Sequence, residues 1–442
     1  MHQKSTSSES GQVLVILVLA IVGLLAFAAL AIDGGLIYAD RRGAQNAADA
    51  SVLAGGYRVA NTLDDFNMGF SINYFNWNCT NIQPIITDFA EPEAVSQAAK
   101  NNYPIEGDSS ITFFCETGED FGSYKDKFVE TRTEIFSDVT TAFLHFAFDG
   151  ATRNTVDAIS RVRPRMPLAF GYAVYAHRKS CPNNATGGIQ VEGSPTAVIS
   201  GGGMISGACV SFIGSSNTTV TGGHPINYIT TKSGTASVSP TPTPQTNTLP
   251  EWALLFPTVD CSNLPNASSN GDGTISPGVY ASGIQITGNE QLLMNPGLYC
   301  FDNDFNINGN NSSFVKINGS GGVTIYMRQG NFTSNGNATV QLQAPNYVVT
   351  ANDGLKGVLI YMGPSNTGEV SLLGNSDSWY NGTIYGEHED STIKIGGTAG
   401  ATSIFNTQLI AGTVRIHGNA ALNINFDSGL VYLLPSRLTL EK

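Results

Sequence analysis

The stretch IQITGNEQLLMNPGLYCFDNDFNINGN, residues 284–310, contains two short runs that each end in Gly-Asn. In each run apolar and polar side chains alternate, which is typical of a β-strand with one buried face. The two corner glycines, Gly288 and Gly309, are 21 residues apart. A repeat of about 20 residues is typical of stacked structural units, each of which forms one coil of a solenoid.

The same corner recurs on both sides of this stretch, at intervals of 21 residues from 193 to 214 and of 22 from 374 to 396 and 418. Val414 and Ile416 point inward while Arg415 and His417 point outward, so each coil has an apolar face that its neighbours must cover. Gly and Asn tolerate the positive φ of tight turns. The sequence therefore predicts a parallel, right-handed β-helix, with an antiparallel sandwich as the alternative. The predicted structural turn glycines are Gly288, Gly309, Gly374, Gly396 and Gly418, in a series that includes Gly193, Gly214 and Gly336.

Residues 233–248, SGTASVSPTPTPQTNT, interrupt this repeat with three prolines in five positions. Proline cannot donate a ladder hydrogen bond, and segments of this composition are extended and solvated. We expect an inserted loop or spacer over 233–250, between first solenoid coils at 166–232 and further coils at 251–442. The alternative is a linker between two short solenoid blocks.

Residues 13–32, VLVILVLAIVGLLAFAALAI, are 20 consecutive positions without a charge. At about 1.5 Å per residue they reach about 30 Å, the thickness of a bilayer's hydrocarbon core. We expect a single transmembrane helix here, preceded by a cytoplasmic tail at 1–12. A cleaved signal sequence is the alternative, although its apolar core is usually only about 7–15 residues long.

An apolar stripe of Ile37, Ala44, Ala48 and Val52 extends the helix beyond this span, and Gly55-Gly56 predicts its end. We expect residues 33–165 to form a small, membrane-proximal α+β domain that begins with this extension. Its further predicted elements are a helix at 93–101, strands at 110–115 and 127–133, a helix at 141–150 and a closing strand at 155–162.

Residues 11–56 resemble the N-terminal segment of TadG-like proteins of Flp pilus assembly. The matching features are the apolar span after Gly-Gln, the exit Ile32-Asp33-Gly34-Gly35, Tyr38, the pair Arg41-Arg42 and the run Gln45-Asn46-Ala47-Ala48-Asp49-Ala50. The resemblance implies a cytoplasmic N-terminus, an exported body and association with the tight-adherence pilus machinery. Many members of the family have a von Willebrand A-type domain, but this sequence has no D-x-S-x-S motif, so that adhesive mechanism is not implied.

Type IV-like pilins have a similar layout but need Glu at the fifth mature position, where this chain has Ile16 after Gly11. We therefore expect no prepilin-peptidase cleavage and a helix that stays in the cytoplasmic membrane. Arg41 and Arg42 outweigh Lys4 in the tail, so a positive-inside count points the body inward. Long domains translocate largely regardless of charge, and we expect the body to be extracytoplasmic.

The chain is acidic, with 22 Lys and Arg against 35 Asp and Glu and a net charge of −13. It has no basic tract longer than two residues, which excludes a nucleic-acid partner. The expected partners are the membrane and either pilus-machinery proteins or surface glycans.

All six cysteines lie beyond the apolar span, and none forms a CxxC motif. An even number fits disulfides in an exported protein, although six cysteines allow 15 connectivities and buried thiols are the alternative. Pairing within each expected structural block joins Cys79 to Cys115, Cys181 to Cys209 and Cys261 to Cys300.

The sequence predicts no catalytic residue, cofactor or metal site. The six histidines have no HExxH-type spacing, and Glu-His-Glu-Asp at 387–390 is expected to be a solvated loop. β-Helix enzymes place carboxylates, or a carboxylate and Arg, on adjacent coils. Asp302 and Asp304 could lie on the same face of one strand, but no Lys or Arg is positioned beside them by spacing. We expect a non-catalytic structural or adhesive envelope protein, with an anchored β-helix polysaccharide lyase or hydrolase as the alternative.

Overall fold

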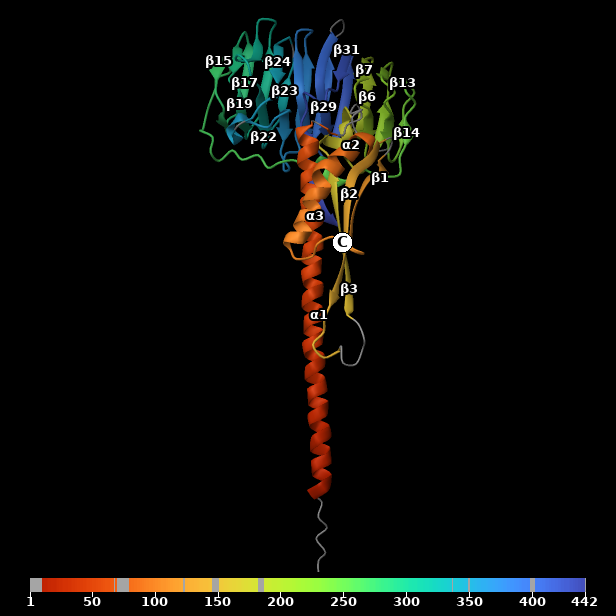
Figure 1. Ribbon diagram of the computed structural model, residues 1–442. Helices are drawn as coiled ribbons and strands as arrows, with labels where there is room; N and C mark the ends of the chain where they lie inside the picture. Colours follow the sequence, from red (N-terminus) through yellow and green to blue (C-terminus); the bar gives the residue numbers. More distant parts are fainter. Residues whose placement is uncertain are drawn as a thin grey trace, which may run out of the picture.

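The computed structural model describes residues 10–66, 68–69, 79–121, 124–144, 151–181, 187–335, 337–348, 350–397 and 402–441. Within these residues the chain forms a long N-terminal helix, a small α+β unit around the second half of that helix, and a parallel β-solenoid (Figure 1). The predicted class, a mainly β chain with an N-terminal helix, an α+β domain and a parallel solenoid, is confirmed. The antiparallel sandwich is excluded because the solenoid strands pair in parallel.

Helix α1 (Ser10–Asp65) is continuous over 56 residues, which is about 84 Å at 1.5 Å per residue. The predicted end at Gly55-Gly56 is wrong, because these glycines serve packing. A Cβ on Gly55 would lie 3.0 Å from the Cβ of Ala94, and one on Gly56 would lie 2.6 Å from Cδ1 of Leu438. The missing side chains let the next helix and the sheet approach the backbone of α1.

The α+β unit packs an antiparallel sheet and two short helices around α1. The sheet consists, in spatial order, of β1 (Ser110–Phe121), β2 (Tyr124–Val139), β3 (Thr152–Arg163) and β33 (Arg437–Glu441). The helical elements are α2 (Cys79–Ile85), the π-helical turn η1 (Ile86–Ala90) and α3 (Glu91–Lys100). The predicted helix at 93–101 and strands at 110–115, 127–133 and 155–162 are confirmed.

The helix predicted over 141–150 is not formed at 141–143, and Leu144 is in a 3₁₀ conformation. The backbone N–H groups of Ala142, Phe143 and Leu144 bind the carboxylate of Asp33 instead. Residues 145–150 lie outside the described part of the chain.

The predicted apolar stripe of α1 is the face that packs on the sheet. Ala44, Ala48 and Val52 are fully buried in one cluster with Ile135 and Val156 of β2 and β3. Small residues at these positions bring the helix axis close to the strands, so the helix and the sheet share one core.

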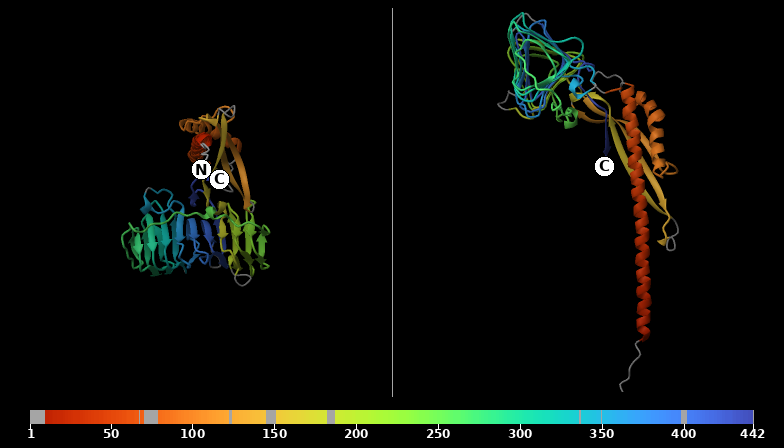
Figure 2. Two further views of the ribbon diagram at one scale, coloured as in Figure 1. Left: turned by 90° about the horizontal axis from the view of Figure 1, so that it is seen from below. Right: turned by 90° about the vertical axis from the view of Figure 1, so that its left-hand side faces the viewer.

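The solenoid has three faces and a triangular cross-section (Figure 2). Face 1 consists of β7 (Thr196–Ser200), β10 (Asn217–Val220), β13 (Ser237–Ser239), β15 (Gly273–Ile275), β18 (Gln291–Met294), β21 (Phe314–Ile317), β24 (Thr339–Gln343), β31 (Ala421–Asn425) and the first halves of β27 (Trp379–Gly386) and β29 (Thr402–Ala411). Face 2 consists of the second halves of β27 and β29 with β5 (Val174–Ala176), β8 (Met204–Ser206), β11 (Ile226–Tyr228), β14 (Thr243–Pro244), β16 (Gly278–Tyr280), β19 (Gly297–Phe301), β22 (Val323–Met327) and β25 (Val358–Met362). Face 3 consists of β6 (Gly188–Gly193), β9 (Cys209–Phe212), β12 (Lys232–Ser233), β17 (Ile284–Gly288), β20 (Phe305–Gly309), β23 (Phe332–Ser334), β26 (Glu369–Gly374), β28 (Thr392–Gly397) and β30 (Thr413–Gly418).

The chain enters and leaves this solenoid in the middle. The first coil, β5 to β7, is followed by two coils that lead to one end, and the chain then crosses over residues 245–272 to the other end. From there it winds back until β29, β30 and β31 pair in parallel with β5, β6 and β7. The predicted blocks at 166–232 and 251–442 therefore form one uninterrupted stack.

Inward side chains of successive coils are stacked in rows that fill the interior. On face 3 one row is buried over eight coils and continues in register: Ile284, Phe305, Phe332, Val370, Ile393, Val414, Ile189 and Val210. Each coil covers one side of the next coil, which is why the apolar period of two recurs along the sequence of the solenoid.

The Pro/Thr-rich segment at 233–250 is not a spacer. Its strands β13 and β14 are the last ones on faces 1 and 2, and they pair with β10 and β11 on one side only. Proline is tolerated at a sheet edge, where its missing N–H faces away from the ladder. The prolines thus occupy the open end of the solenoid, where they also discourage pairing with another chain.

The turn glycines differ from the prediction at Gly309 and Gly396. Gly288 and Gly418 have φ of +55° and +102°, whereas Gly309 and Gly396 are strand residues outside the left-handed region. The position predicted for Gly396 is off by one, because Gly397 is the residue that pairs with Gly418. Gly309 and Gly396 are needed for space: a Cβ on either would contact Ser313 or the carbonyl oxygen of His417. Gly374 ends β26 and pairs with Gly397, and Gly336 lies outside the described residues.

The end of the chain returns to the α+β unit, which corrects the predicted range 251–442. The short strands β4 (Met166–Pro167) and β32 (Leu433–Leu434) pair where the chain leaves the unit and re-enters it. Beyond them β33 pairs with β3, so the solenoid is inserted between two neighbouring strands of one sheet.

We predict that Gly418→Val lowers the free energy of unfolding by about 1–3 kcal/mol, because the side chain would be strained at positive φ. A Cβ there would also lie 2.7 Å from the carbonyl oxygen of Gly397. The matched control is Gly288→Asn: its φ is +55° and no heavy atom lies within 4 Å of the added Cβ, so we expect a change below about 0.5 kcal/mol. Denaturant melts of both variants test this, and equal stability of Gly418→Val and wild type would contradict the stacked corner.

Candidate functional site

The first half of α1 is an isolated apolar rod. Its large aliphatic side chains are solvent-exposed in the structure, for example Leu24 at 69% and Phe27 at 74%. Within the described residues this is one helix that is long and apolar enough to cross a membrane. An exposed apolar surface of this size requires an apolar environment or a partner.

Asp33 marks the point where the rod meets the folded body. Its carboxylate is only 2% exposed and accepts hydrogen bonds of 2.5–3.1 Å from the backbone N–H groups of Ala142, Phe143 and Leu144. Three successive N–H groups around an anion form a compact anion-binding loop. Asp33 therefore ties the loop after β2 to the helix at the boundary of the apolar segment.

Asp40 holds the next two turns of the helix to the sheet. Its carboxylate accepts hydrogen bonds from Ser137 Oγ at 2.9 Å, Asn154 Nδ2 at 2.7 Å and Tyr103 Oη at 3.0 Å. Burial, together with this bond to Asp40, raises the pKa of Tyr103 to about 12. Gly43 is required beside it, because a Cβ would lie 2.5 Å from the Tyr103 hydroxyl.

The run Gln45-Asn46-Ala47-Ala48-Asp49-Ala50 docks the helix on β3. Ala47 and Ala48 are fully buried, and Gln45 Nε2 donates to the carbonyl oxygen of Asp157 at 3.0 Å and to Asp49 at 2.9 Å. Arg41 and Arg42 point to solvent beside this contact. The residues that carry the sequence resemblance thus split into an exposed apolar rod and a contact surface for the sheet.

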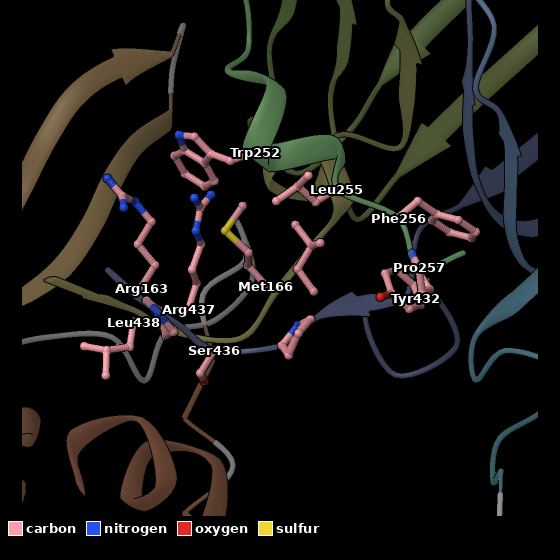
Figure 3. Close-up of a pocket in the computed structure, with 13 residues that line it drawn as sticks. Arg163, Met166, Trp252, Leu255, Phe256, Pro257, Tyr432, Ser436, Arg437 and Leu438 are labelled. Atoms are coloured by element: carbon pink, nitrogen blue, oxygen red, sulfur yellow. The ribbon is translucent and has the colours of Figure 1, made fainter. Parts of the chain in front are cut away.

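A cavity of about 520 Å³ lies where the solenoid joins the α+β unit (Figure 3). Trp252 and Phe256 line it from the crossing segment, and Tyr432 lines it from the returning chain. Arg163, at the end of β3, forms a largely buried ion pair with Asp126 at 2.9 Å, and its guanidinium lies 4.6 Å from the centre of the Trp252 ring. This junction fixes the orientation of the solenoid relative to α1.

Residues 249–261, which we call the strap, cover the outside of face 2 and include the turn η5 (Glu251–Leu254). Beneath the strap, Tyr326, Tyr361 and Tyr385 are stacked in a row, with ring centres 4.9 and 5.8 Å apart. Phe256 of the strap packs on two of these rings. Burial is the main cause that raises the pKa of Tyr361, and its hydrogen bond to Glu387 adds to this effect. The row is therefore a structural contact for the strap.

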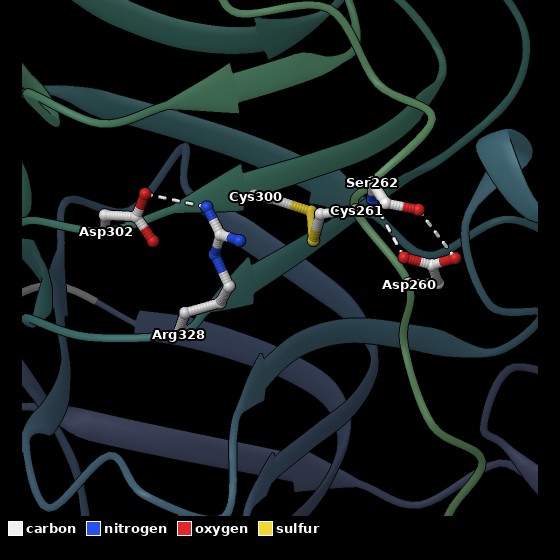
Figure 4. Close-up of a disulfide and its surroundings, with 6 residues drawn as sticks. All are labelled: Asp260, Cys261, Ser262, Cys300, Asp302 and Arg328. Carbon is white, nitrogen blue, oxygen red and sulfur yellow. Dashed lines mark hydrogen bonds and ion pairs between the residues drawn. A yellow bond between two sulfur atoms is a disulfide. The ribbon is translucent and has the colours of Figure 1, made fainter.

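The three disulfides join the pairs expected from sequence neighbours: Cys79 with Cys115, Cys181 with Cys209 and Cys261 with Cys300. The first links α2 to β1, and the second links a corner loop to the next coil. The third ties the end of the strap to β19 (Figure 4). Each disulfide closes a loop of 28–39 residues, and such a link stabilises a fold by limiting the unfolded chain.

Asp302 has an arginine partner that spacing did not predict. Arg328, one coil further along the stack, donates to its carboxylate at 2.7 Å (Figure 4). Asp304 is directed elsewhere, since it accepts the backbone N–H of Asn331 at 2.8 Å. The coil that separates Asp302 from Arg328 is 26 residues long, whereas the predicted repeat is 21 or 22, so sequence spacing did not place them together.

The polar run at 387–390 does not converge on one point. Asp390 pairs with Arg178 at 2.9 Å, and Glu387 binds the hydroxyl of Tyr361. Among the described residues, no group of three or more His, Cys, Asp or Glu side chains could hold a metal ion. His177 packs against the Tyr385 ring and its pKa is lowered mainly by burial.

Sequence reasoning missed the two carboxylates that anchor the helix. Asp33 and Asp40 are part of the matching segment, but no periodicity shows that they face the sheet. The available signal was their position: they are the first two acids after a long uncharged span. An acid at this place in an apolar stripe has to find hydrogen-bond donors if it is buried.

One comparison with known protein families matches the N-terminal part of the chain, including the segment of α1 that contacts the sheet. Residues 11–59 match the family model described as putative Flp pilus-assembly TadE/G-like, so the N-terminal segment is pilus-related. No curated protein matches the chain in sequence. A solved structure that is similar to it, the competence-associated pilin ComZ from Thermus thermophilus, has 10% sequence identity and a TM-score of 0.23, with 76% of this chain and 89% of that chain covered.

We predict that Asp33→Ala accelerates amide hydrogen exchange at residues 142–144 by about 10- to 100-fold, because hydrogen bonds to a charged group contribute about 1.5–3 kcal/mol. Exchange in the core of β2 should stay unchanged. Glu93→Ala, an exposed acid on α3, is the control and should leave the loop protected. Unchanged exchange at 142–144 in Asp33→Ala would show that the carboxylate does not hold this loop.

Proposed function

We propose that this chain is a single-pass protein of the cytoplasmic membrane with an extracytoplasmic body, and that it serves a tight-adherence-type pilus assembly system in a non-catalytic structural or adhesive role. The observation that carries the proposal is the first half of α1, an exposed apolar rod that lies within the segment, residues 11–59, matching the Tad family. A bilayer would cover this rod over residues 13–32. The contact surface from Asp33 to Ala50 then lies just outside it.

The cysteines support the orientation. Three disulfides connect the α+β unit, the solenoid corner and the strap, and structural disulfides persist in oxidising compartments outside the cytoplasm. Exposed Tyr38 and Phe143 lie just beyond the apolar span, and aromatic side chains favour the membrane interface.

The solenoid supports a presenting role. It is a rigid body whose coils all lie side by side, and the junction holds it at one end of a long helix (Figure 2). Extended concave or flat surfaces of this type are used for binding without chemistry. The pilus machinery or a surface glycan would be the partner.

The alternative is an anchored β-helix enzyme acting on extracellular polysaccharide. One observation favours it. Asp302 and Arg328 lie on adjacent coils with their charged atoms 2.7 Å apart, and their side chains are 36% and 37% exposed, which is the type of pair a glycosidic site would use. Against it, Asp304 is engaged by Asn331, and among the residues that the structure describes no second carboxylate is hydrogen-bonded to this pair.

Topology can be tested with a protease site in two places. Inserted at the exposed corner of residues 221–223 of the solenoid, the site should be cut when protease is added to spheroplasts. Inserted in the tail at 1–9, the same site should be protected until the membrane is lysed. The reverse pattern would place the body in the cytoplasm and refute the proposal.

Function can be tested by deletion with matched complementation. Cells without this chain should lose surface pili or attachment, and both wild type and Asp302→Asn should restore them, because the role needs no reactive carboxylate. Full-length protein in detergent should release no sugar from polysaccharides. Normal pili and attachment in the deletion strain, with sugar release that Asp302→Asn abolishes, would establish the enzyme instead.

A further inference from the structure

The strands of face 1 carry almost no charge, although the protein is acidic. Its ten strands, β7, β10, β13, β15, β18, β21, β24, β27, β29 and β31, contain no Asp, Glu or Arg and one Lys, Lys316. Face 3 differs, with Glu192, Glu369, Lys394 and Arg415 among its outward positions. The net charge of −13 is therefore carried by other surfaces than face 1.

Outward side chains on face 1 form rows that run along the solenoid axis. One row includes Gln341, Trp379, Ile404, Asn423 and Val198, each in register with the next. Neighbouring strands of a sheet are about 4.8 Å apart, so ten strands extend over about 40 Å. Ile404 is 41% exposed, and Trp379 is half-buried at the centre of the row. The face thus combines a flat apolar strip with amide and hydroxyl groups.

A second row beside it is held in place by its own hydrogen bonds. Ser200 Oγ donates to Asn425 at 2.9 Å, Asn425 Nδ2 donates to Asn406 at 3.2 Å, and Asn406 Nδ2 donates to Asn381 at 2.8 Å. Each amide nitrogen has a second N–H, and each carbonyl oxygen has a second lone pair. The row therefore presents fixed donors and acceptors, and binding to it costs little side-chain entropy.

We infer that face 1 binds a linear, uncharged polysaccharide along the solenoid axis. A sugar offers hydroxyl groups at its edge, which pair with amides, and an apolar C–H face, which packs on an aromatic ring such as Trp379. A neutral polymer needs no charged partner, and this face offers almost none. A polyanion would instead be repelled by the acidic remainder of the molecule. This inference rests on the proposed adhesive role and names the class of ligand for it.

The binding test uses full-length protein in a zwitterionic detergent without sugar head groups. Native gels contain one of three uncharged polymers, hydroxyethylcellulose, galactomannan or dextran, or the anionic carboxymethylcellulose. We expect retardation by at least one uncharged polymer and none by carboxymethylcellulose. Trp379→Ala should raise the dissociation constant at least tenfold, and Asn423→Asp, which adds a charge to the face, at least threefold.

The control is Tyr57→Ala, which removes an aromatic side chain that is 62% exposed on α1 and should leave binding unchanged. Circular dichroism and thermal melts establish that each variant is folded. Wild type that no uncharged polymer retards, retardation by carboxymethylcellulose alone, or unchanged binding by folded Trp379→Ala would overturn the inference. So would self-association of the chain that Asn423→Asp abolishes, since a second copy would then occupy the face.

The two proposals fail separately. If deletion of the chain abolishes pili or attachment but no polymer binds, the glycan inference is wrong and the proposed role stands. If the chain binds an uncharged polymer through Trp379 and the deletion strain has normal pili and attachment, the pilus role is wrong.

Discussion

The architecture depends on the parallel pairing of the last solenoid coil with the first. Val174, Tyr175 and Ala176 of β5 pair with Leu409, Ile410 and Ala411 of β29, across more than half of the chain. A coil with an apolar face is stable only when both neighbours cover it, and this pairing gives the first and last coils their second neighbour. It also brings the entry and the exit of the solenoid together in its middle. Only because of this can β3 and β33 be adjacent strands of one sheet.

The same pairing of β5 with β29 positions the solenoid and the helix, the two parts that we link to function. The entry and exit strands attach the solenoid to the α+β unit. The unit is held to the helix by hydrogen bonds of Asp33, Asp40 and Gln45. The two ends of the stack then lie on opposite sides of this junction, one formed by the proline-rich strands and the other by residues 265–272 (Figure 1). Face 2 is used for the strap and the junction, which leaves face 1 with its outward rows available.

Local periodicity was enough to predict most of the strands and the class of fold, because strand alternation and a repeat near 21 residues are properties of neighbouring residues. It could not predict the order of the coils, since neither the segment around Val174 nor the one around Leu409 has a sequence feature that identifies the other as its partner. Gly55-Gly56 and Gly396 were misassigned for a related reason: glycine permits both positive φ and close packing, and only the tertiary partner decides between them. The helix anchors and the pair of Asp302 with Arg328 likewise depend on contacts between distant segments.

The pairing of the last solenoid coil with the first can be tested directly by disulfide trapping. Val198 on β7 and Asn423 on β31 are outward residues paired in register, so Val198→Cys with Asn423→Cys should form a disulfide within one chain, at the Cα separation that adjacent strands provide. Val198→Cys with Ile404→Cys lies one strand further apart and should not cross-link under the same oxidant. Peptide mapping that finds the first link and the three native disulfides supports the account. Absence of the first link in folded protein, or efficient formation of the second, would contradict it.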